Sequence, residues 1–225
     1  MTLNVLYEDN HLLVINKPAG MLSQSDKTGD LSLVDNAKKY LKEKYKKPGN
    51  VFCGLVHRLD RPVSGVIILA RTSKALERMN KQFQERSVNK IYEAMINERP
   101  GQESGTLTHW LVKDHTINKV KASNKLVKNG VKAVLDYELT NRTGSTYLLE
   151  IKLHTGRPHQ IRTQLAKAIG PIIGDNKYGW KGKNDTGSIA LHAKKIEFTH
   201  PVTKQQIVIE ASTDTNPFWK KLGIE

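Results

Sequence analysis

A short polar stretch between two apolar runs sets the strongest constraint on how this chain can fold. Residues 57–65 read HRLDRPVSG, and they lie between the largely apolar residues 51–56 and the continuous apolar run VIILA at residues 66–70. Such a run is typical of a strand that is buried on both faces. Because Pro62 and Gly65 favour a turn, the sequence predicts two strand-like segments joined by a polar turn.

This turn places one carboxylate between two arginines at the edge of the predicted core. Asp60 follows Arg58 by two residues and directly precedes Arg61. Charged side chains are rarely left beside a core unless they are paired, because desolvation disfavours the ionised form. An acid in this position invites a functional interpretation. The alternative is an ion pair that closes a loop, and the nine residues alone favour that structural interpretation.

The charge of the chain indicates a polyanionic partner. The 36 Lys and Arg residues exceed the 22 Asp and Glu residues and give a net charge of +14, while 38% hydrophobic residues are enough for a core. A membrane surface would also attract such a protein. However, no apolar run approaches the ~20 residues of a spanning helix, and residues 1–8 lack a signal-peptide pattern.

The cysteine and histidine content argues against disulfides and metal sites. Cys53 is the only cysteine, which excludes a disulfide framework and a cysteine-based zinc site, and the eight histidines show no close metal-ligand spacing. We therefore expect no metal, and a protein of a reducing compartment, most simply the cytoplasm.

Periodicity along the chain predicts a single α+β domain over residues 1–225, with a large, mostly antiparallel sheet flanked by helices. Ser32 and Asp35 resemble a capping box at the start of a helix over residues 31–47. We expect weak strand character at residues 105–117 and an exposed loop or hairpin tip at residues 113–128. The other expected elements are strands at residues 3–7, 11–16, 88–96, 133–139, 147–153, 196–198 and 207–209, and helices at residues 73–83 and 158–169.

Two further features have both a structural and a functional interpretation. The polar face of the helix over residues 31–47 carries Lys38 and Lys42, and it is either an ordinary solvated face or one that contacts phosphates. Tyr92, in a predicted strand, is by itself best interpreted as an aromatic residue of the core.

A second polar stretch, HTGRPHQIR at residues 154–162, leads into a predicted helix. The free N–H groups and the positive dipole end of a helix start suit a phosphate or carboxylate, and Arg157 adds a full charge. Arg162 lies beside Ile161, so part of its stem should face apolar neighbours, which favours pairing with a buried carboxylate. The alternative is a capped helix with a solvent-facing arginine.

These segments together resemble a known family. HRLD with SG at residues 57–65, KIY at 90–92 and GRPHQIR at 156–162 are similar, in this order, to the signature segments of RluA-type RNA pseudouridine synthases. The flanks agree: YEDNHLLVINKPAG at 7–20, GDNKYG at 174–179, LHA at 191–193 and FTHP at 198–201 resemble that family's framework, so the resemblance covers nearly the whole chain.

The departures from the family's pattern are small. Relatives often have Thr at the position of Pro158 and His at that of Gln164, and many carry an S4-like domain before the catalytic one, whereas this chain begins at the catalytic domain. The resemblance implies a pseudouridine synthase fold with an active-site cleft across the sheet. It also implies a reaction without cofactor, in which the bond between ribose C1′ and uracil N1 is cut, the base rotates, and C1′ is joined to C5.

The resemblance also assigns roles to residues. Asp60 is the catalytic carboxylate, as a nucleophile at C1′ or as the base that removes the 2′ proton, and both routes stay open. Arg162 is the basic partner that keeps this carboxylate ionised. Tyr92 stacks on the target base and is a candidate for the proton step at C5. A paired base must be everted to reach such a site, and Arg58 would fill the vacated space.

The expected partner is a structured stem-loop of ribosomal or transfer RNA, bound by a monomer without membrane or metal. Two other classes explain part of the pattern. A non-catalytic RNA-binding protein would account for the charge but not for an acid between arginines, and a glycoside hydrolase generally needs two carboxylates. The further residues expected to contact RNA are His57, Arg61, Lys17, Arg157, His159, Gln160, Lys38 and Lys42.

Overall fold

The computed structural model describes residues 3–26, 29–114 and 116–222. Its helices are α1 (Leu33–Lys44), α2 (Ser73–Glu85), α3 (Gln160–Ala168) and α4 (Pro217–Leu222), with short 3-10 turns η1 (Asn176–Tyr178) and η2 (Thr213–Thr215). Its strands are β1 (Val5–Glu8), β2 (Leu12–Lys17), β3 (Gly54–Leu55), β4 (Ser64–Ala70), β5 (Asn89–Ile96), β6 (Ser104–Asp114), β7 (Lys119–Ser123), β8 (Val131–Thr143), β9 (Thr146–Leu153), β10 (Leu191–Thr199) and β11 (Gln206–Glu210).

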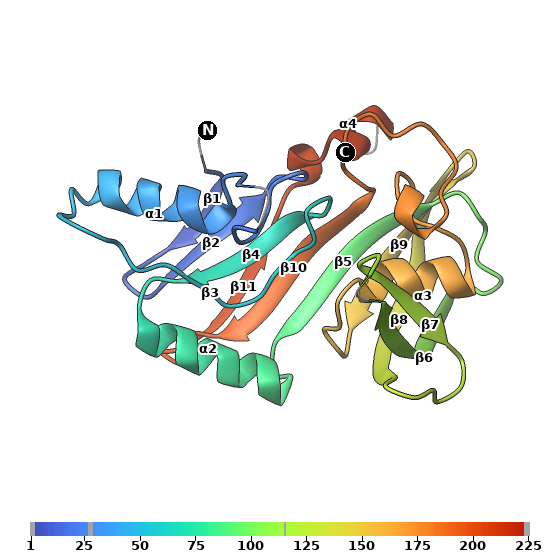
Figure 1. The fold of residues 1–225 in the computed structure, drawn as a ribbon, viewed down its shortest axis with the longest axis horizontal. Coiled ribbons are helices and arrows are strands. Elements are labelled where there is room, and N and C mark those ends of the chain that lie inside the picture. Colours follow the sequence, from blue (N-terminus) through green and yellow to red (C-terminus); the bar gives the residue numbers. More distant parts are fainter. Residues whose placement is uncertain (1–2, 27–28, 115, 223–225) are drawn as a thin grey trace.

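All strands of the described chain belong to one mixed sheet (Figure 1). Its order is β1-β2-β4-β10-β5-β9-β8-β6-β7, while β3 pairs with β4 and β11 pairs with β10. The pairings are antiparallel except that of β4 with β10. The large, mostly antiparallel sheet expected from the sequence is confirmed, and the single parallel pair joins β4 and β10 at its centre.

The helices cover both faces of the sheet because each has one apolar stripe. In α1, Leu33, Ala37 and Leu41 share a core with Ile161 and Leu165 of α3, so these two helices lie on the same face. The stripe of α2 instead packs in a second core against the opposite face. Figure 1 shows α1 over β1 and β2 at one end of the sheet and α3 beside β6 to β9 at the other end.

The strand that follows the polar turn is buried on both faces, as its continuous apolar run predicts. Every residue of β4 is buried, because one side packs in the α1 and α3 core and the other side packs in the α2 core. The segment before the turn is less regular than expected. Over residues 51–56 only Gly54–Leu55 forms strand pairing.

The start of β4 depends on a glycine. Gly65 pairs in parallel with Ala193 of β10 and has a φ of 114°, in the region that favours glycine. A Cβ atom at this position would overlap the backbone of Ala193. The close approach of two backbones, rather than turn geometry alone, therefore requires Gly65.

The sequence-based assignment was only partly right over residues 105–128. β6 is a regular strand of 11 residues, and β7 pairs with it in a hairpin inside the segment expected to be an exposed loop or hairpin tip. The sequence KVKAS of β7 alternates: Val120 is buried in a small cluster, while Lys121 is exposed. The many lysines concealed this period of two. Residue 115 of the segment lies outside the described residues.

The observed starts of α1 and α3 can be compared with the starts predicted from the sequence. Ser32 caps α1 as predicted, because its hydroxyl accepts a hydrogen bond from Asp35 N while the Asp35 carboxylate accepts from the Ser32 backbone. The helix expected from residue 158 begins instead at Gln160. The preceding residue, His159, has a φ of 52° and cannot be helical.

The helices of the described chain are all too short or too polar to cross a membrane. A single domain over residues 1–225 stays a prediction, supported by the one sheet that the strands share; the two ends of that range lie outside the described residues.

Candidate active site

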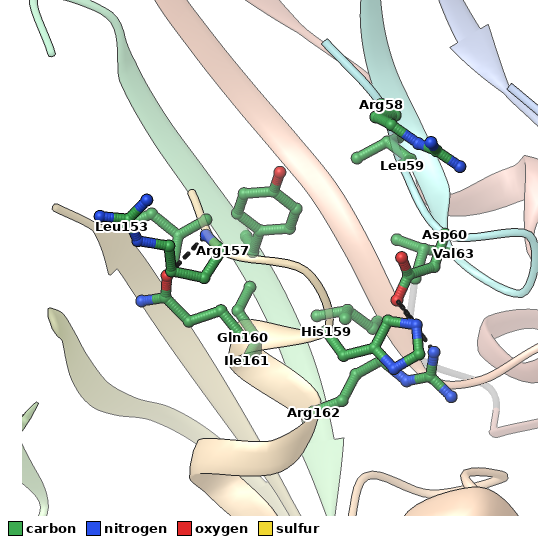
Figure 2. Close-up of a pocket in the computed structure, with 12 residues that line it drawn as sticks. Arg58, Leu59, Asp60, Val63, Leu153, Arg157, His159, Gln160, Ile161 and Arg162 are labelled. Carbon is green, nitrogen blue, oxygen red and sulfur yellow. Dashed lines mark hydrogen bonds and ion pairs between the residues drawn. The ribbon is translucent and has the colours of Figure 1, made fainter. Parts of the chain in front are cut away.

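The three residues predicted to be catalytic, Asp60, Tyr92 and Arg162, line one cavity, although they lie far apart in the sequence. They come from the turn before β4, from β5 and from α3. The cavity is open to solvent, and its empty space, including the open part, amounts to about 390 Å³. Figure 2 shows Asp60 and Arg162 joined across it. Its lining is completed by Arg58, Leu59, Val63, Leu153, Arg157, His159, Gln160, Ile161 and Leu191.

The turn that carries Asp60 is held from both sides. Val63 N donates to the Asp60 carbonyl over 3.0 Å, which closes the turn. The buried Ser23 hydroxyl accepts from Leu59 N and donates to Leu59 O, at 3.2 and 2.7 Å. With the backbone fixed in this way, the Asp60 side chain stays 28% exposed, so its carboxylate can meet a ligand.

Arg162 bridges two carboxylates. Its Nη1 donates to Asp60 Oδ2 over 2.9 Å, while its Nε and Nη2 donate to Asp175 Oδ2 and Oδ1 over 2.7 and 2.9 Å. The expected pairing of Arg162 with Asp60 is therefore present, and a second partner is added. Because the Asp175 side chain is only 1% exposed, it orients Arg162 but cannot itself reach a ligand in the cavity.

Sequence reasoning did not single out Asp175, which stands within the framework motif GDNKYG. The sequence does contain a signal for Asp175. This acid comes just after the apolar residues 171–173, and Asp60 likewise lies beside an apolar run. The tertiary structure was needed to show that both acids share Arg162.

The charges in the cavity follow from burial and pairing. Burial lowers the pKa of Arg162, but hydrogen bonds and charge from Asp175 and Asp60 outweigh this effect and raise it overall. The guanidinium therefore stays charged. Burial, and then the negative charge of Asp60, raise the pKa of the Tyr92 phenol. The Tyr92 phenol therefore stays neutral. It can take part in proton transfer only when a bound ligand changes its pKa.

His159 lies beside the carboxylate, with its Nε2 3.8 Å from Asp60 Oδ2. The Tyr178 hydroxyl accepts from Val120 N over 3.0 Å and lies 2.7 Å from His159 Nδ1, so we assign its proton to a bond toward Nδ1. The neutral imidazole then carries its proton on Nε2, facing Asp60. Burial lowers the pKa of His159, although the charge of Asp60 opposes this, so the neutral ring is the form at pH 7.

Lys17 does not lie where a phosphate could reach it, so the RNA contact expected for it is wrong. The residue is 0% exposed. Its ammonium donates to the carbonyls of Pro18, Met21 and Arg61, at 2.9, 2.8 and 3.3 Å. Burial lowers its pKa to about 7, with Asp60 opposing this shift. Lys17 ties the segment at residues 18–21 to the Asp60 turn and is a positioning residue.

Two other residues expected to contact RNA are also held inside the protein. The His57 ring accepts a hydrogen bond from Ile68 N over 3.1 Å and stacks on Phe83. The Gln160 amide accepts from Thr155 Oγ1 and Arg157 N and donates to the Val134 carbonyl. Both are reassigned from RNA contact to support of the surrounding backbone.

The remaining expected RNA contacts are exposed. Arg58 and Arg157 both line the cavity (Figure 2), whereas Arg61 donates to the Gly20 carbonyl and pairs with Asp30. Lys38 and Lys42 lie on the exposed face of α1 and line none of the cavities near Asp60. Their phosphate contacts stay predictions.

The described residues contain no group of three or more His, Cys, Asp or Glu side chains arranged to hold a metal ion. The polar chemistry of the cavity is that of one accessible carboxylate, one paired guanidinium, a neutral phenol and a neutral imidazole. This set suits acid–base or nucleophilic chemistry on a ligand bound in the cavity.

Comparison with known proteins shows the family to which the chain is similar. The family model described as RNA pseudouridylate synthase matches residues 11–167. Ribosomal large subunit pseudouridine synthase C of Buchnera aphidicola subsp. Schizaphis graminum is 34% identical over 218 residues, a match that covers 94% of this chain and 67% of that protein. tRNA pseudouridine synthase C of Haemophilus ducreyi is 34% identical over 241 residues, covering 99% and 95%.

A solved structure confirms the fold. Human RNA Pseudouridylate Synthase Domain Containing 4 superimposes with a TM-score of 0.77 at 25% identity, covering 93% of this chain and 88% of that one. The mixed sheet is thus the fold of an RNA-modifying isomerase. The chain belongs to the RNA pseudouridylate synthase family, of the RluA type, and the family resemblance seen in the sequence is confirmed.

Proposed function

We propose that this enzyme isomerises specific uridines of ribosomal or transfer RNA to pseudouridine, with Asp60 as its catalytic carboxylate. The observation that carries the proposal is the ion pair of Asp60 with Arg162, in which the acid stays partly exposed while its partner is buried. The relatives named above act on ribosomal and transfer RNA by name, and the net charge of +14 suits a partner of this kind.

The reaction needs no net redox change. The bond from ribose C1′ to uracil N1 breaks, the base turns while it stays in the cavity, C1′ bonds to C5, and the proton of C5 is released while N1 gains one. Asp60 acts either by attack on C1′, with later release of the sugar, or by removal of the 2′ proton. The guanidinium of Arg162 holds the carboxylate ionised for either role.

The neighbouring groups complete the proposed mechanism. The Tyr92 ring lines the cavity and would stack on the uracil, an interaction worth roughly 1–3 kcal/mol in other systems. Its neutral phenol is a candidate for the proton transfer at C5. Arg58, exposed at the rim, would occupy the space that the everted base leaves in the RNA.

The setting of the reaction is also part of the proposal. We expect a monomer that acts in the cytoplasm on a compact stem-loop, which is read by shape and by everted bases, as is common for RNA. Neither cofactor nor metal enters the proposed steps.

The test is tritium release from RNA labelled with 5-³H-uridine. Unmodified ribosomal and transfer RNA transcripts would be incubated with the enzyme and with Asp60→Asn and Asp60→Ala. We expect release by the unchanged enzyme and a decrease of at least about 10³-fold in both variants, with each variant still binding RNA. Sequencing for pseudouridine in total RNA of a deletion strain would then identify the uridines.

Two outcomes would point to other functions. Release of free uracil or a ribose fragment would indicate hydrolysis rather than isomerisation. If Asp60→Ala left the cellular activity intact, the protein would act as an RNA-binding module instead. Asp175 does not supply the second carboxylate that a hydrolase generally needs, because both of its oxygens are bonded to Arg162 in the interior.

A further inference from the structure

A second hollow adjoins the Asp60 cavity, and the two share Arg157. It lies where the end of α2, the start of β5 and the turn from β9 to α3 meet. We call it the basic groove. Its lining residues are Asn80, Phe83, Gln84, Arg86, Lys90, His154, Thr155, Gly156 and Arg157.

The basic groove contains cations that the protein does not neutralise. Among the described residues, no carboxylate lies within 4.0 Å of the charged ends of Arg86, Lys90 or Arg157, whereas eight other Lys and Arg side chains form such pairs. The groove's lining includes no Asp or Glu. His154 differs from the three cations, because it is bonded to Asp136. Like charges gathered without a counter-charge repel one another, and an anion from outside would relieve that repulsion.

Lys90 contacts an aromatic ring at the wall of the basic groove. Its ammonium lies 5.7 Å from the centre of the Phe83 ring, and this ring is itself stacked on the His57 ring at 4.9 Å. Burial, and then the charge of Arg86, lower the pKa of Lys90. The lysine thus lies in a place where its charge is unfavourable without a bound anion. Burial would not lower the pKa of a lysine on an ordinary solvated face in this way.

The position of the basic groove links it to the catalytic cavity. Lys90 and Tyr92 are two residues apart on β5, so their side chains point to the same face of the sheet, ~7 Å apart along the strand. Arg157 then bridges the two hollows. A ligand that places a base beside Tyr92 therefore has the next part of its chain at Lys90.

We propose that the basic groove binds phosphates of the RNA strand that adjoins the everted uridine. The inference rests on the proposed function, because it takes RNA as the ligand of the Asp60 cavity. The continuity of the two hollows favours a single strand that fills both over a separate acidic partner. Phosphate contacts of this kind position a nucleic acid without reading its sequence. Arg86, Lys90 and Arg157 would hold the backbone after the base has left its stack.

The experiment compares two pairs of charge-removing variants on one protein. Arg86→Gln with Lys90→Gln removes two cations from the basic groove. Lys74→Gln with Lys81→Gln removes two exposed cations from helix α2, which ends just before Arg86, and neither of them lines the groove. Binding of a fluorescein-labelled uridine-loop RNA hairpin is measured by anisotropy between 50 and 200 mM KCl, and urea unfolding confirms that each variant is folded.

We expect the groove pair to weaken binding at least about tenfold. The slope of log Kd against log salt should also fall, by about 0.7–0.9 for each phosphate that the variant no longer neutralises. The Lys74/Lys81 pair should change Kd by less than twofold. For tritium release, the groove pair should raise KM and leave kcat within about threefold, since neither residue touches the reacting atoms.

The outcomes separate this inference from the proposed function. An unchanged Kd in the groove pair, or equal weakening by both pairs, overturns the inference even if tritium release proceeds normally. Selective weakening without any tritium release from ribosomal or transfer RNA would instead retain the groove as an RNA-binding surface and overturn the proposed reaction.

Discussion

At the scale of single residues, one guanidinium connects two carboxylates with different access to solvent. Arg162 holds Asp175 with two hydrogen bonds in the interior and Asp60 with one at the cavity. The buried acid fixes the orientation of the arginine, and the arginine in turn fixes the accessible acid. The two acids should therefore differ in what their removal costs.

We expect Asp60→Ala to abolish turnover with little loss of stability, because Arg162 keeps its pair of bonds to Asp175. Asp175→Ala should lower the free energy of unfolding by about 3–5 kcal/mol, since it deprives a buried charge of its main partner. Urea denaturation of both variants measures the difference. Equal destabilisation by the two substitutions would contradict this division of roles.

At the scale of elements, the site depends on where two strands meet the turn that carries Asp60. β4 and β10 pair in parallel at Gly65 and Ala193, directly after this turn. Lys17 of β2 and Ser23 hold the turn from the other side through backbone oxygens. The turn that carries Asp60 is thus anchored to interior strands of the sheet rather than to a surface loop, which limits its movement.

Gly65→Ala tests the close approach of β4 and β10. The added Cβ meets the Ala193 backbone and also has to adopt a φ of 114°, so we expect a decrease of at least ~2 kcal/mol in the free energy of unfolding. Gly144→Ala is the matched control, since Gly144 has a φ of 59° but open space around it. Thermal unfolding should show the larger decrease for Gly65→Ala, and the reverse order would refute the steric argument.

At the scale of the whole molecule, charge is concentrated on the surface while several histidines are kept neutral inside. Burial lowers the pKa of His57 to about 3 and that of His192 to about 4. Burial also lowers the pKa of His109 and His159. In the unfolded chain each of these groups titrates near pH 6.5.

Stability should therefore fall as the solution becomes acidic. Between pH 6.5 and about 4 the unfolded chain binds protons that the folded protein does not, so the free energy of unfolding decreases by up to ~1.4 kcal/mol per pH unit for each such histidine. Urea unfolding at pH 5.0 to 6.5 measures the slope. His192→Asn removes one of these histidines, so the free energy of unfolding should depend less steeply on pH, by up to ~1.4 kcal/mol per pH unit. An unchanged slope would show that His192 is not kept neutral in the folded protein.

The net charge of +14 makes a prediction about the protein as a whole. Because binding of RNA by basic side chains releases counterions, affinity for a substrate stem-loop should drop at least about tenfold between 50 and 200 mM KCl. Anisotropy measurements at a series of salt concentrations provide the check. A flat response would show that the basic surface does not contact the RNA backbone.

The sequence by itself determined much of this protein, because several features depend on neighbours along the chain. The period of two and the apolar run at residues 66–70 specified strands, and Ser32 with Asp35 specified a helix start. The ordered motifs around Asp60, Tyr92 and Arg162 indicated the family. Where lysines obscured the alternation, at β7, the same reasoning allowed a hairpin but missed the strand.

Only the tertiary structure decided which polar side chains face the cavity and which serve the interior. Lys17 and Gln160 look like available binding groups in the sequence, yet their bonds go to neighbouring residues and to the backbone carbonyls of the distant Arg61 and Val134. Asp175 looks like part of a framework motif, yet it orients Arg162. The physical reason is that burial and pairing depend on residues that lie far apart in the sequence. The neighbours of a residue along the chain do not show which distant groups it will contact in the folded protein.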